Sequence, residues 1–189
     1  KPLRLLNLSE DEKKLIKDLA FLTLKPVMYC VNVAESELPH GGKLVDVVRE
    51  YAKQEGSELV VISGKIESEL ADMTDEEKKE FLTELGLKEP GLNQLIRAGY
   101  RLLELITYFT AGEKEVRAWT IKSGTKAPQA AGVIHSDFER GFIRAETMNY
   151  SDLVSLGSAQ IVKDKGLLRI EGKGYVVKDG DVMLFRFSV

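Results

Sequence analysis

The stretch EVRAWTIKSGTKAPQAAGVIHSDFERGFIRAETMNYSDLVSLGS, residues 115–158, decides the fold of the second half of this chain, together with GKGYVVKDGDVMLFRF at residues 172–187. Runs rich in β-branched and aromatic residues predict strands, and helical patterns interrupt them. The expected strands are 106–112, 115–122, 142–150, 167–172 and 176–187, and the expected helices lie around 130–139 and 151–164. A mixed sheet crossed by helices indicates an α+β arrangement.

The residues before this stretch alternate between strand-like and helical patterns, which is typical of an α/β arrangement. Residues 27–33 and 58–62 are nearly continuous apolar runs, as in parallel strands that are buried on both faces. Residues 43–53 between them keep helical spacing, so we expect a βαβ unit. Cys30 lies in the first apolar run and is expected to be a small core residue.

Two Ser/Thr-x-x-Glu patterns mark helix starts on either side of this unit. Ser9 with Glu12, and Thr74 with Glu77, have the spacing of a capping box. The pattern then becomes strand-rich at Thr107, which predicts a domain boundary near Ile106.

Composition excludes some classes of protein and sets the expected compartment. The 189 residues carry 27 Lys and Arg against 30 Asp and Glu, a formal net charge of −3, which argues against coating nucleic acid by bulk charge. The single cysteine excludes an intramolecular disulfide and a cysteine-rich zinc site. No apolar run approaches the ~20 residues of a membrane span, and the start is not a signal peptide. We therefore expect a cytoplasmic protein with no membrane partner.

The C-terminal stretch resembles the TGS domain that closes the YchF/Obg-like ATPases, a ribosome-associated branch of the P-loop nucleotide hydrolases. The likeness is carried by residues 115–122, 124–135, 137–145 and 175–187. This resemblance covers essentially the whole chain. It implies the end of a helical insertion at 1–25, the C-terminal part of a GTPase-like nucleotide-binding domain with a parallel sheet at 26–106, and a β-grasp, ubiquitin-like TGS domain at 107–189.

The resemblance gives a meaning to Asn32-Val33-Ala34-Glu35, which follows the first expected strand. On its own, Asn-x-x-Glu is equally well a strand end followed by a helix-capping acid. GTPases of this superfamily carry Asn-Lys-x-Asp here, and their Asp accepts hydrogen bonds from the ring N–H and the amino group of guanine. The YchF branch is similar to this chain in carrying Asn-x-x-Glu, which implies that Asn32, the Val33 backbone and Glu35 meet adenine in ATP, with GTP as the alternative nucleotide.

Ser63 and Gly64 follow the second expected strand, where the superfamily packs a Ser-Ala-Lys-like loop beside the base. The resemblance implies that both contact the nucleobase. The alternative is a plain strand-to-helix turn, in which Gly permits unusual backbone angles.

The phosphate-binding pattern Gly-x-x-x-x-Gly-Lys-Ser/Thr is missing, since PHGGK and EGKGY have the wrong spacing. We therefore expect the phosphate and Mg²⁺ ligands of the full-length ATPase to lie before Lys1. No catalytic or metal-binding residue is assigned to this chain. His135 beside Ser136 and Asp137 is not read as a catalytic triad, because triad partners come from separate parts of a fold.

Cations interleaved with aromatic residues suggest an RNA- or ribosome-binding face in the C-terminal region. The candidates are Arg117, Lys122, Lys126, Arg140 and Arg144, and the alternative is a solvated mixed surface.

The resemblance therefore implies the C-terminal portion of a ribosome-associated, ATP-hydrolysing protein, inactive as this chain alone and expected to be monomeric. The alternatives are a non-catalytic module that binds RNA, the ribosome or a protein, and an unrelated structural α/β protein.

Overall fold

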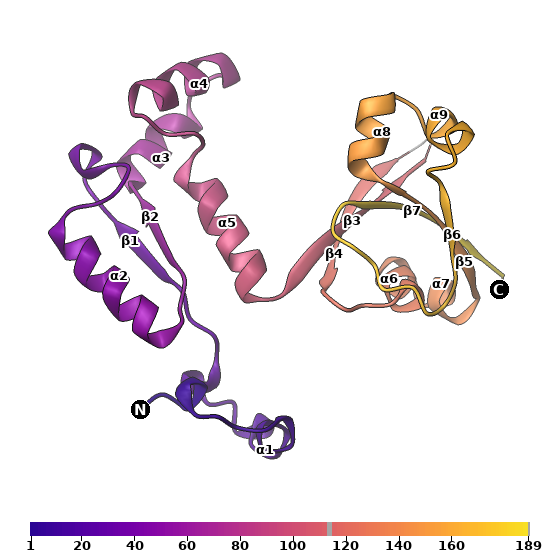
Figure 1. The fold of residues 1–189 in the computed structure, drawn as a ribbon, viewed down its shortest axis with the longest axis horizontal. Coiled ribbons are helices and arrows are strands. Elements are labelled where there is room, and N and C mark those ends of the chain that lie inside the picture. The colour runs from indigo at the N-terminus through magenta and orange to yellow at the C-terminus, as the bar shows by residue number, and fades with distance from the viewer. Residues whose placement is uncertain (113–114, 189) are drawn as a thin grey trace. The chain divides into compact units, whose positions relative to one another are not determined.

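The computed structural model describes residues 1–112 and 115–188. The chain forms two compact units, Lys1–Leu103 and Glu104–Val189, each with its own sheet (Figure 1). The sequence placed the change of architecture near Ile106, which lies inside the first strand of the second unit. A mixed α/β fold with one parallel and one mixed sheet is confirmed.

The first 25 residues form short helical turns. They are η1 (Leu3–Leu5), α1 (Glu10–Leu15), η2 (Lys17–Leu19) and η3 (Leu22–Leu24). Ser9 and Glu12 form the predicted capping box at the start of α1. The helix ends early, and its apolar Leu15 is 83% exposed. A short helix without a packing partner gains too little to continue.

One buried carboxylate ties this segment to the parallel sheet of the first unit. Glu55 accepts hydrogen bonds from Arg4 at 3.0 Å, from the Tyr29 hydroxyl at 2.9 Å and from the Tyr51 hydroxyl at 3.1 Å. The bond from Arg4, followed by that from Tyr29, holds the pKa of Glu55 below its usual range.

The predicted βαβ unit consists of β1 (Tyr29–Asn32), α2 (Lys43–Glu55) and β2 (Leu59–Ile62), with η4 (Glu35–Glu37) in the connection. The strands are parallel, and Asn32 is paired in register with Ile62. The expectation that Cys30 is a core residue is wrong, because its side chain is exposed. Residues of β1 alternate between partly buried and exposed, because successive side chains point to opposite faces of the sheet and Cys30 lies on the exposed face.

Three helices complete the first unit: α3 (Gly64–Ala71), α4 (Asp75–Glu84) and α5 (Gly91–Leu102). Thr74 and Glu77 form the predicted capping box of α4. The buried side chains of Ile66, Leu70 and Leu82 pack α3 against α4. The amide of Gly91 donates to Glu67 at 2.7 Å, which fixes the start of α5 against α3.

The second unit is built on a five-stranded sheet in the order β4-β3-β7-β5-β6. Its strands are β3 (Leu105–Ala111), β4 (Val116–Lys122), β5 (Phe142–Asn149), β6 (Arg169–Glu171) and β7 (Asp181–Phe187). The pairs β3–β4, β5–β6 and β5–β7 are antiparallel, whereas β3 and β7 run parallel.

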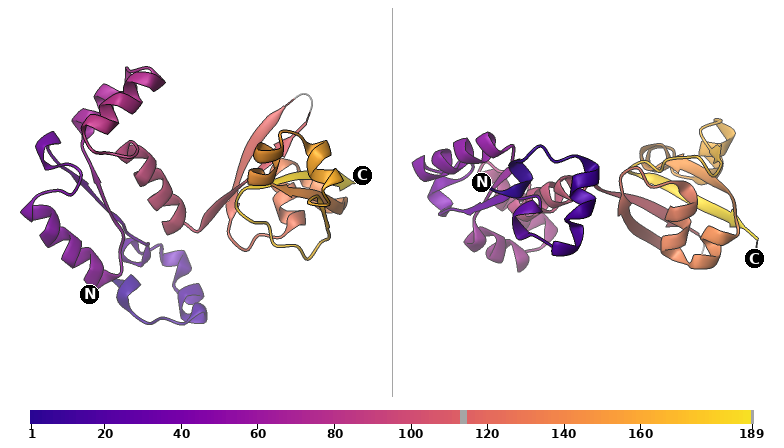
Figure 2. Two further views of the ribbon diagram at one scale, coloured as in Figure 1. Left: turned by 45° about the horizontal axis from the view of Figure 1, so that its top comes forward. Right: turned by 90° about the horizontal axis from the view of Figure 1, so that it is seen from below.

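Helices cover both faces of this sheet (Figures 1 and 2). The helices are α6 (Ala127–Ile134), α7 (Ser136–Arg140), α8 (Tyr150–Leu156) and α9 (Ala159–Asp164). The larger core contains Tyr108, Ile121 and Phe185 with the alanines of α6, and Trp119 and Phe138 pack against it. Met148, Val162 and Val182 form a smaller core under α8 and α9.

Within the described residues, every helix is too short or too polar to cross a membrane.

Candidate functional site

The candidate base-binding site lies where β1 and β2 end side by side. The Val33 amide donates to the Ile62 carbonyl at 2.9 Å, which extends the parallel pairing by one step. The Gly64 amide then donates to Asn32 Oδ1 at 2.8 Å. Because parallel strands bring their carboxyl ends to the same edge, the two predicted loops meet here.

These loops line one open cavity of about 710 Å³. Its walls include Asn32, Val33, Glu35 and Ser63, four of the five predicted base-binding residues. The fifth, Gly64, lies next to the cavity and is held by its hydrogen bond to Asn32. A side chain at Gly64 would place a Cβ 3.5 Å from Asn32 Oδ1, so the two loops approach closely at this point. The structure therefore brings all five residues together.

Lys65 is a further residue of this cavity, and its role there was not predicted. Its Nζ lies 3.3 Å from a carboxylate oxygen of Glu35 and 3.7 Å from one of Glu69. The hydrogen bond to Glu35, with the attraction of both acids, raises the pKa of Lys65. Glu35 thus faces a permanent cation, and its carboxylate is partly engaged before any ligand arrives.

Ser63 is the most buried of the predicted site residues, with 2% of its surface exposed. Its hydroxyl is buried and has no hydrogen-bond partner among the described residues. A buried hydroxyl without a partner costs about 1–3 kcal/mol, so a ligand or water that bonds to it would recover free energy. Ser63 also lines a second cavity of about 410 Å³, beside α3 and the start of α5.

The five predicted RNA-contacting cations do not share one face of the second unit. Ile121 and Trp119 turn toward the core under α6 and α7, and Arg117, two residues from Trp119 on β4, lies on that same face. Its guanidinium stands 4.3 Å from the centre of the Trp119 ring. Lys122 and Arg144 are each one residue from a member of that core, so they point to the opposite face.

The three arginines are also near acids. Arg117 lies 3.9 Å from Glu115, and Arg144 lies 3.9 Å from Glu146. Arg140 forms an ion pair with Asp137 one turn earlier on α7. Lys122 and Lys126 are exposed and form no ion pair within residues 1–112 and 115–188.

His135 has a structural role. Its Nδ1 accepts a hydrogen bond from the Asp137 amide at 3.2 Å, which caps the start of α7. The described part of the chain also contains no group of three or more His, Cys, Asp or Glu residues that could hold a metal ion.

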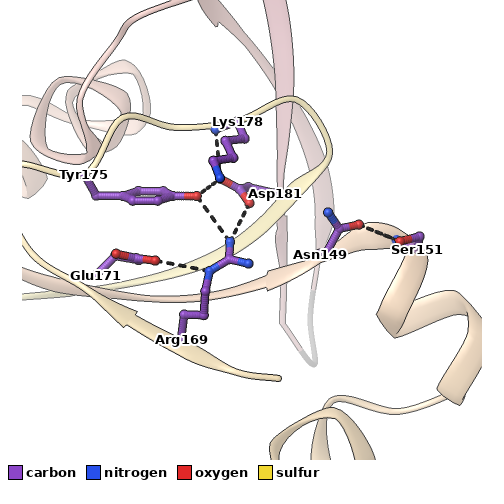
Figure 3. Close-up of polar contacts among 7 residues, drawn as sticks. All are labelled: Asn149, Ser151, Arg169, Glu171, Tyr175, Lys178 and Asp181. Carbon is purple, nitrogen blue, oxygen red and sulfur yellow. Dashed lines mark hydrogen bonds and ion pairs between the residues drawn. The ribbon is translucent and has the colours of Figure 1, made fainter. Parts of the chain in front are cut away.

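A buried polar network in the second unit was not foreseen from the sequence (Figure 3). Asp181 is 1% exposed and accepts from Arg169 at 3.1 Å, from the Tyr175 hydroxyl at 2.7 Å and from the Lys178 amide at 2.9 Å. Arg169 also donates to Glu171 at 3.1 Å. Nothing in the local pattern of residues 178–181 indicates that Asp181 anchors the segment before it.

Comparison with known proteins connects both units to one family. The family model YchF-GTPase_C, described as a protein of unknown function (DUF933), matches residues 105–188. "Ribosome-binding ATPase YchF" of Bacillus subtilis (strain 168) is 56% identical over 191 residues, covering 100% of this chain and 52% of that protein. The protein of the same name from Escherichia coli O157:H7 is 56% identical over 187 residues, covering 99% of this chain and 51% of the relative.

Solved structures agree with these matches. The structure titled "Structure of the Schizosaccharomyces pombe YchF GTPase" has a TM-score of 0.88 and 39% identity, and the match covers 98% of this chain and 50% of that one. A GTP binding protein from Pyrococcus horikoshii OT3, at 18% identity and a TM-score of 0.63, shares the fold. The chain spans about half the length of the curated relatives it matches. Identity above half along the whole chain, joined to the family model and to a close backbone match, shows that this chain belongs to the YchF family.

Proposed function

We propose that the first unit is the base-recognition side of an ATP-binding site in a ribosome-binding ATPase. The supporting observation is the hydrogen bond from the Gly64 amide to Asn32 Oδ1, which joins two loops around one open cavity. In this proposal residues 1–25 end a helical insertion, and residues 26–106 are the C-terminal part of the nucleotide-binding domain.

The hydrogen-bonding groups of this cavity favour adenine over guanine. Asn32 Oδ1 is engaged by Gly64, so its amide NH₂ remains a donor for a purine ring nitrogen. The Val33 amide is engaged by Ile62, so Val33 meets a ligand through its carbonyl. A carbonyl accepts from the 6-amino group of adenine and repels the 6-oxo group of guanine. Glu35, which stands where GTPases place a guanine-binding Asp, is drawn toward Lys65.

Hydrolysis is proposed for the full-length protein and not for this chain alone. The relatives carry the word ATPase in their names, and one solved structure carries the word GTPase in its title. Mg²⁺ would supply charge stabilisation at the transferred phosphate. No Mg²⁺ ligand is assigned to this chain, because it lacks the Gly-x-x-x-x-Gly-Lys-Ser/Thr pattern whose hydroxyl binds that ion.

The second unit is proposed to be a β-grasp TGS domain, residues 107–189, that makes the ribosome contact. Its mixed sheet, with β3 and β7 running parallel between antiparallel strands, supports a β-grasp. The names of the relatives support a ribosomal partner and, with it, a cytoplasmic location. We propose that the protein is a monomer.

A titration of the ¹⁵N-labelled chain with AMP and with GMP tests the base site by NMR. The amide signals of residues 32–35, 63 and 64 should shift more with AMP. Equal or larger shifts with GMP, or shifts confined to other residues, would contradict the adenine proposal. Co-sedimentation of the chain with ribosomes tests the second unit separately.

A further inference from the structure

The second unit carries a basic surface that differs from the predicted one. Lys122, Lys126, Lys173 and Lys178, here called the lysine cluster, are all exposed. None of the four forms an ion pair within the described part of the chain, whereas Arg117, Arg140 and Arg144 each have an acid within 4 Å. The four ammonium groups are therefore available to an external anion.

Backbone contacts bring the two segments of the cluster together. The Ala127 amide donates to the Tyr175 carbonyl at 2.9 Å, and the Val177 amide donates to the Thr125 carbonyl at 3.0 Å. Lys126 forms an isolated antiparallel bridge with Val176. Residues 175–177 therefore run beside residues 125–127, and the segment between β6 and β7 passes the start of α6 in Figure 1.

The pairing also sets the direction of the side chains. Val177 is buried in the larger core, so its neighbours Val176 and Lys178 point away from it, toward solvent. Lys126 is directly opposite Val176 in this bridge, and Lys178 follows Val176 by two residues on the same side of the segment. Lys122 begins the turn that leads to Lys126, since the Thr125 amide donates to the Lys122 carbonyl at 3.2 Å.

The Asp181 network holds this surface in place (Figure 3). Asp181 accepts from the Lys178 amide and from the Tyr175 hydroxyl, the two ends of the segment that pairs with residues 125–127. The carboxylate is neutralised by Arg169 and is buried, so it does not compete for the charge of the cluster. A segment fixed in this way loses little conformational freedom when a ligand binds.

Residues 122–127 and 172–178 contain no acidic residue, and the exposed acids Glu104 and Asp179 adjoin these segments through backbone contacts or sequence. The Glu104 carbonyl accepts from the Ser123 amide, and the Asp179 carboxylate accepts from the Thr107 amide at 2.8 Å. Glu171 is engaged by Arg169. Four lysines against two acids leave a local excess of positive charge in a chain whose formal net charge is −3.

We propose that the lysine cluster binds phosphate groups of RNA. This inference rests on the proposed ribosome contact and names its surface and its chemistry. Lysine ammonium groups act as point charges with three donors each, which suits phosphates approached from several directions. Contacts of this kind position a polyanion without reading its bases.

The test uses the full chain and two double variants. Lys126→Glu with Lys173→Glu reverses charge in the lysine cluster, and Arg140→Glu with Arg144→Glu is the matched control. All four side chains are exposed, so both variants should keep the wild-type CD spectrum and melting temperature. The probes are a fluorescent oligouridylate, followed by anisotropy, and ribosomes, followed by co-sedimentation.

We expect the cluster variant to lose about tenfold or more in oligouridylate affinity, while the control changes by about twofold or less. The double variant Lys126→Gln with Lys173→Gln removes two charges. The slope of log association constant for oligouridylate against log salt concentration should therefore become shallower by about 1.4. Ribosome co-sedimentation should fall in parallel with oligouridylate affinity.

Two results separate this inference from the proposed function. If ribosomes bind the cluster variant as tightly as the wild type, the lysine cluster is not the contact surface, whereas the proposed ribosome contact stands. If ribosomes bind neither protein, the ribosome contact fails, and the oligouridylate series alone decides whether the cluster binds RNA. Equal oligouridylate binding by the wild type and the cluster variant overturns the inference, as does a wild type that binds polyglutamate but not RNA.

Discussion

Asn32 Oδ1 accepts a hydrogen bond from the Gly64 amide at 2.8 Å, although the two residues are 32 positions apart in the chain. The contact spans the ends of two parallel strands and leaves the Asn32 NH₂ group as a donor. One side chain therefore has two separable tasks: it holds the second loop, and it offers a donor to a ligand in the cavity.

The first prediction separates these tasks with two variants. Asn32→Ala should lower the free energy of unfolding by about 1 kcal/mol, because it removes the bond to Gly64. Asn32→Asp keeps an acceptor for Gly64 and loses the donor, so stability should stay near wild type while the NMR shifts with AMP disappear. Urea unfolding and the AMP titration measure the two effects, and Asn93→Ala on α5 is the control. If the Asn93→Ala variant also loses its NMR shifts with AMP, the loss in the Asn32 variants does not locate the AMP site in this cavity.

The second prediction concerns base choice in a protein of full family length. Val33→Lys with Glu35→Asp restores the Asn-Lys-x-Asp pattern of GTPases, so preference should move toward GTP by about tenfold, or about 1.4 kcal/mol. Competition binding of ATP and GTP measures this. Lys65→Gln frees Glu35 from its ion pair. This variant should also move the preference toward GTP, but by less than the double variant does. A wild type that already binds GTP far more tightly than ATP would show that our interpretation of residues 32–35 is wrong.

Local patterns predicted most of the elements and their order. Both capping boxes form where the Ser/Thr-x-x-Glu spacing predicts them. These features depend on residues close in sequence. The predicted strand at 176–187 begins later, at Asp181, because residues 175–177 pair with residues 125–127 instead.

Features that depend on distant contacts were predicted less well. Cys30 lies in an apolar run, yet exposure depends on which neighbours cover β1, and the pattern of the run does not contain that information. The five candidate cations were grouped by their closeness in sequence. Strand alternation places Arg117 and Arg144 on opposite faces, and acids pair with the arginines through the fold. The lysine cluster needs the pairing of residues 125–127 with 175–177, which local patterns do not reveal.

A third prediction tests the Asp181 network. Asp181→Ala removes three hydrogen bonds from a buried carboxylate and leaves Arg169 without its partner, so the free energy of unfolding should fall by about 3 kcal/mol. Denaturant unfolding of the full chain measures this. Asp164→Ala, at an exposed position on α9, is the control and should change stability by about 0.5 kcal/mol or less. Similar losses in both variants would contradict an anchoring role for Asp181.

The fourth prediction is a loss of stability at alkaline pH that depends on Tyr175. Burial, followed by the hydrogen bond to Asp181, raises the pKa of Tyr175 to about 12. An unfolded tyrosine titrates near pH 10, so the folded state holds its proton more tightly. The resulting stability is fully present below about pH 10 and is lost as pH rises toward 12. Tyr175→Phe should weaken this pH dependence in urea unfolding at pH 9 to 12. If the loss of stability between pH 9 and 12 is the same in the Tyr175→Phe variant as in the wild type, other groups cause it and the prediction is wrong.

The fifth prediction is that the two units can be separated by limited proteolysis. Each unit has its own core, and the division falls between Leu103 and Glu104, directly after α5. Trypsin should cut early at Arg101, which is exposed at the end of α5, and should release a stable fragment containing the five-stranded sheet. Mass spectrometry identifies the fragment, and its CD melting curve tests whether it folds alone. Arg101→Gln should delay this cut without changing the melting of the fragment sheet. Uniform resistance of the whole chain, with a single cooperative transition for both units, would show one continuous core and overturn the prediction.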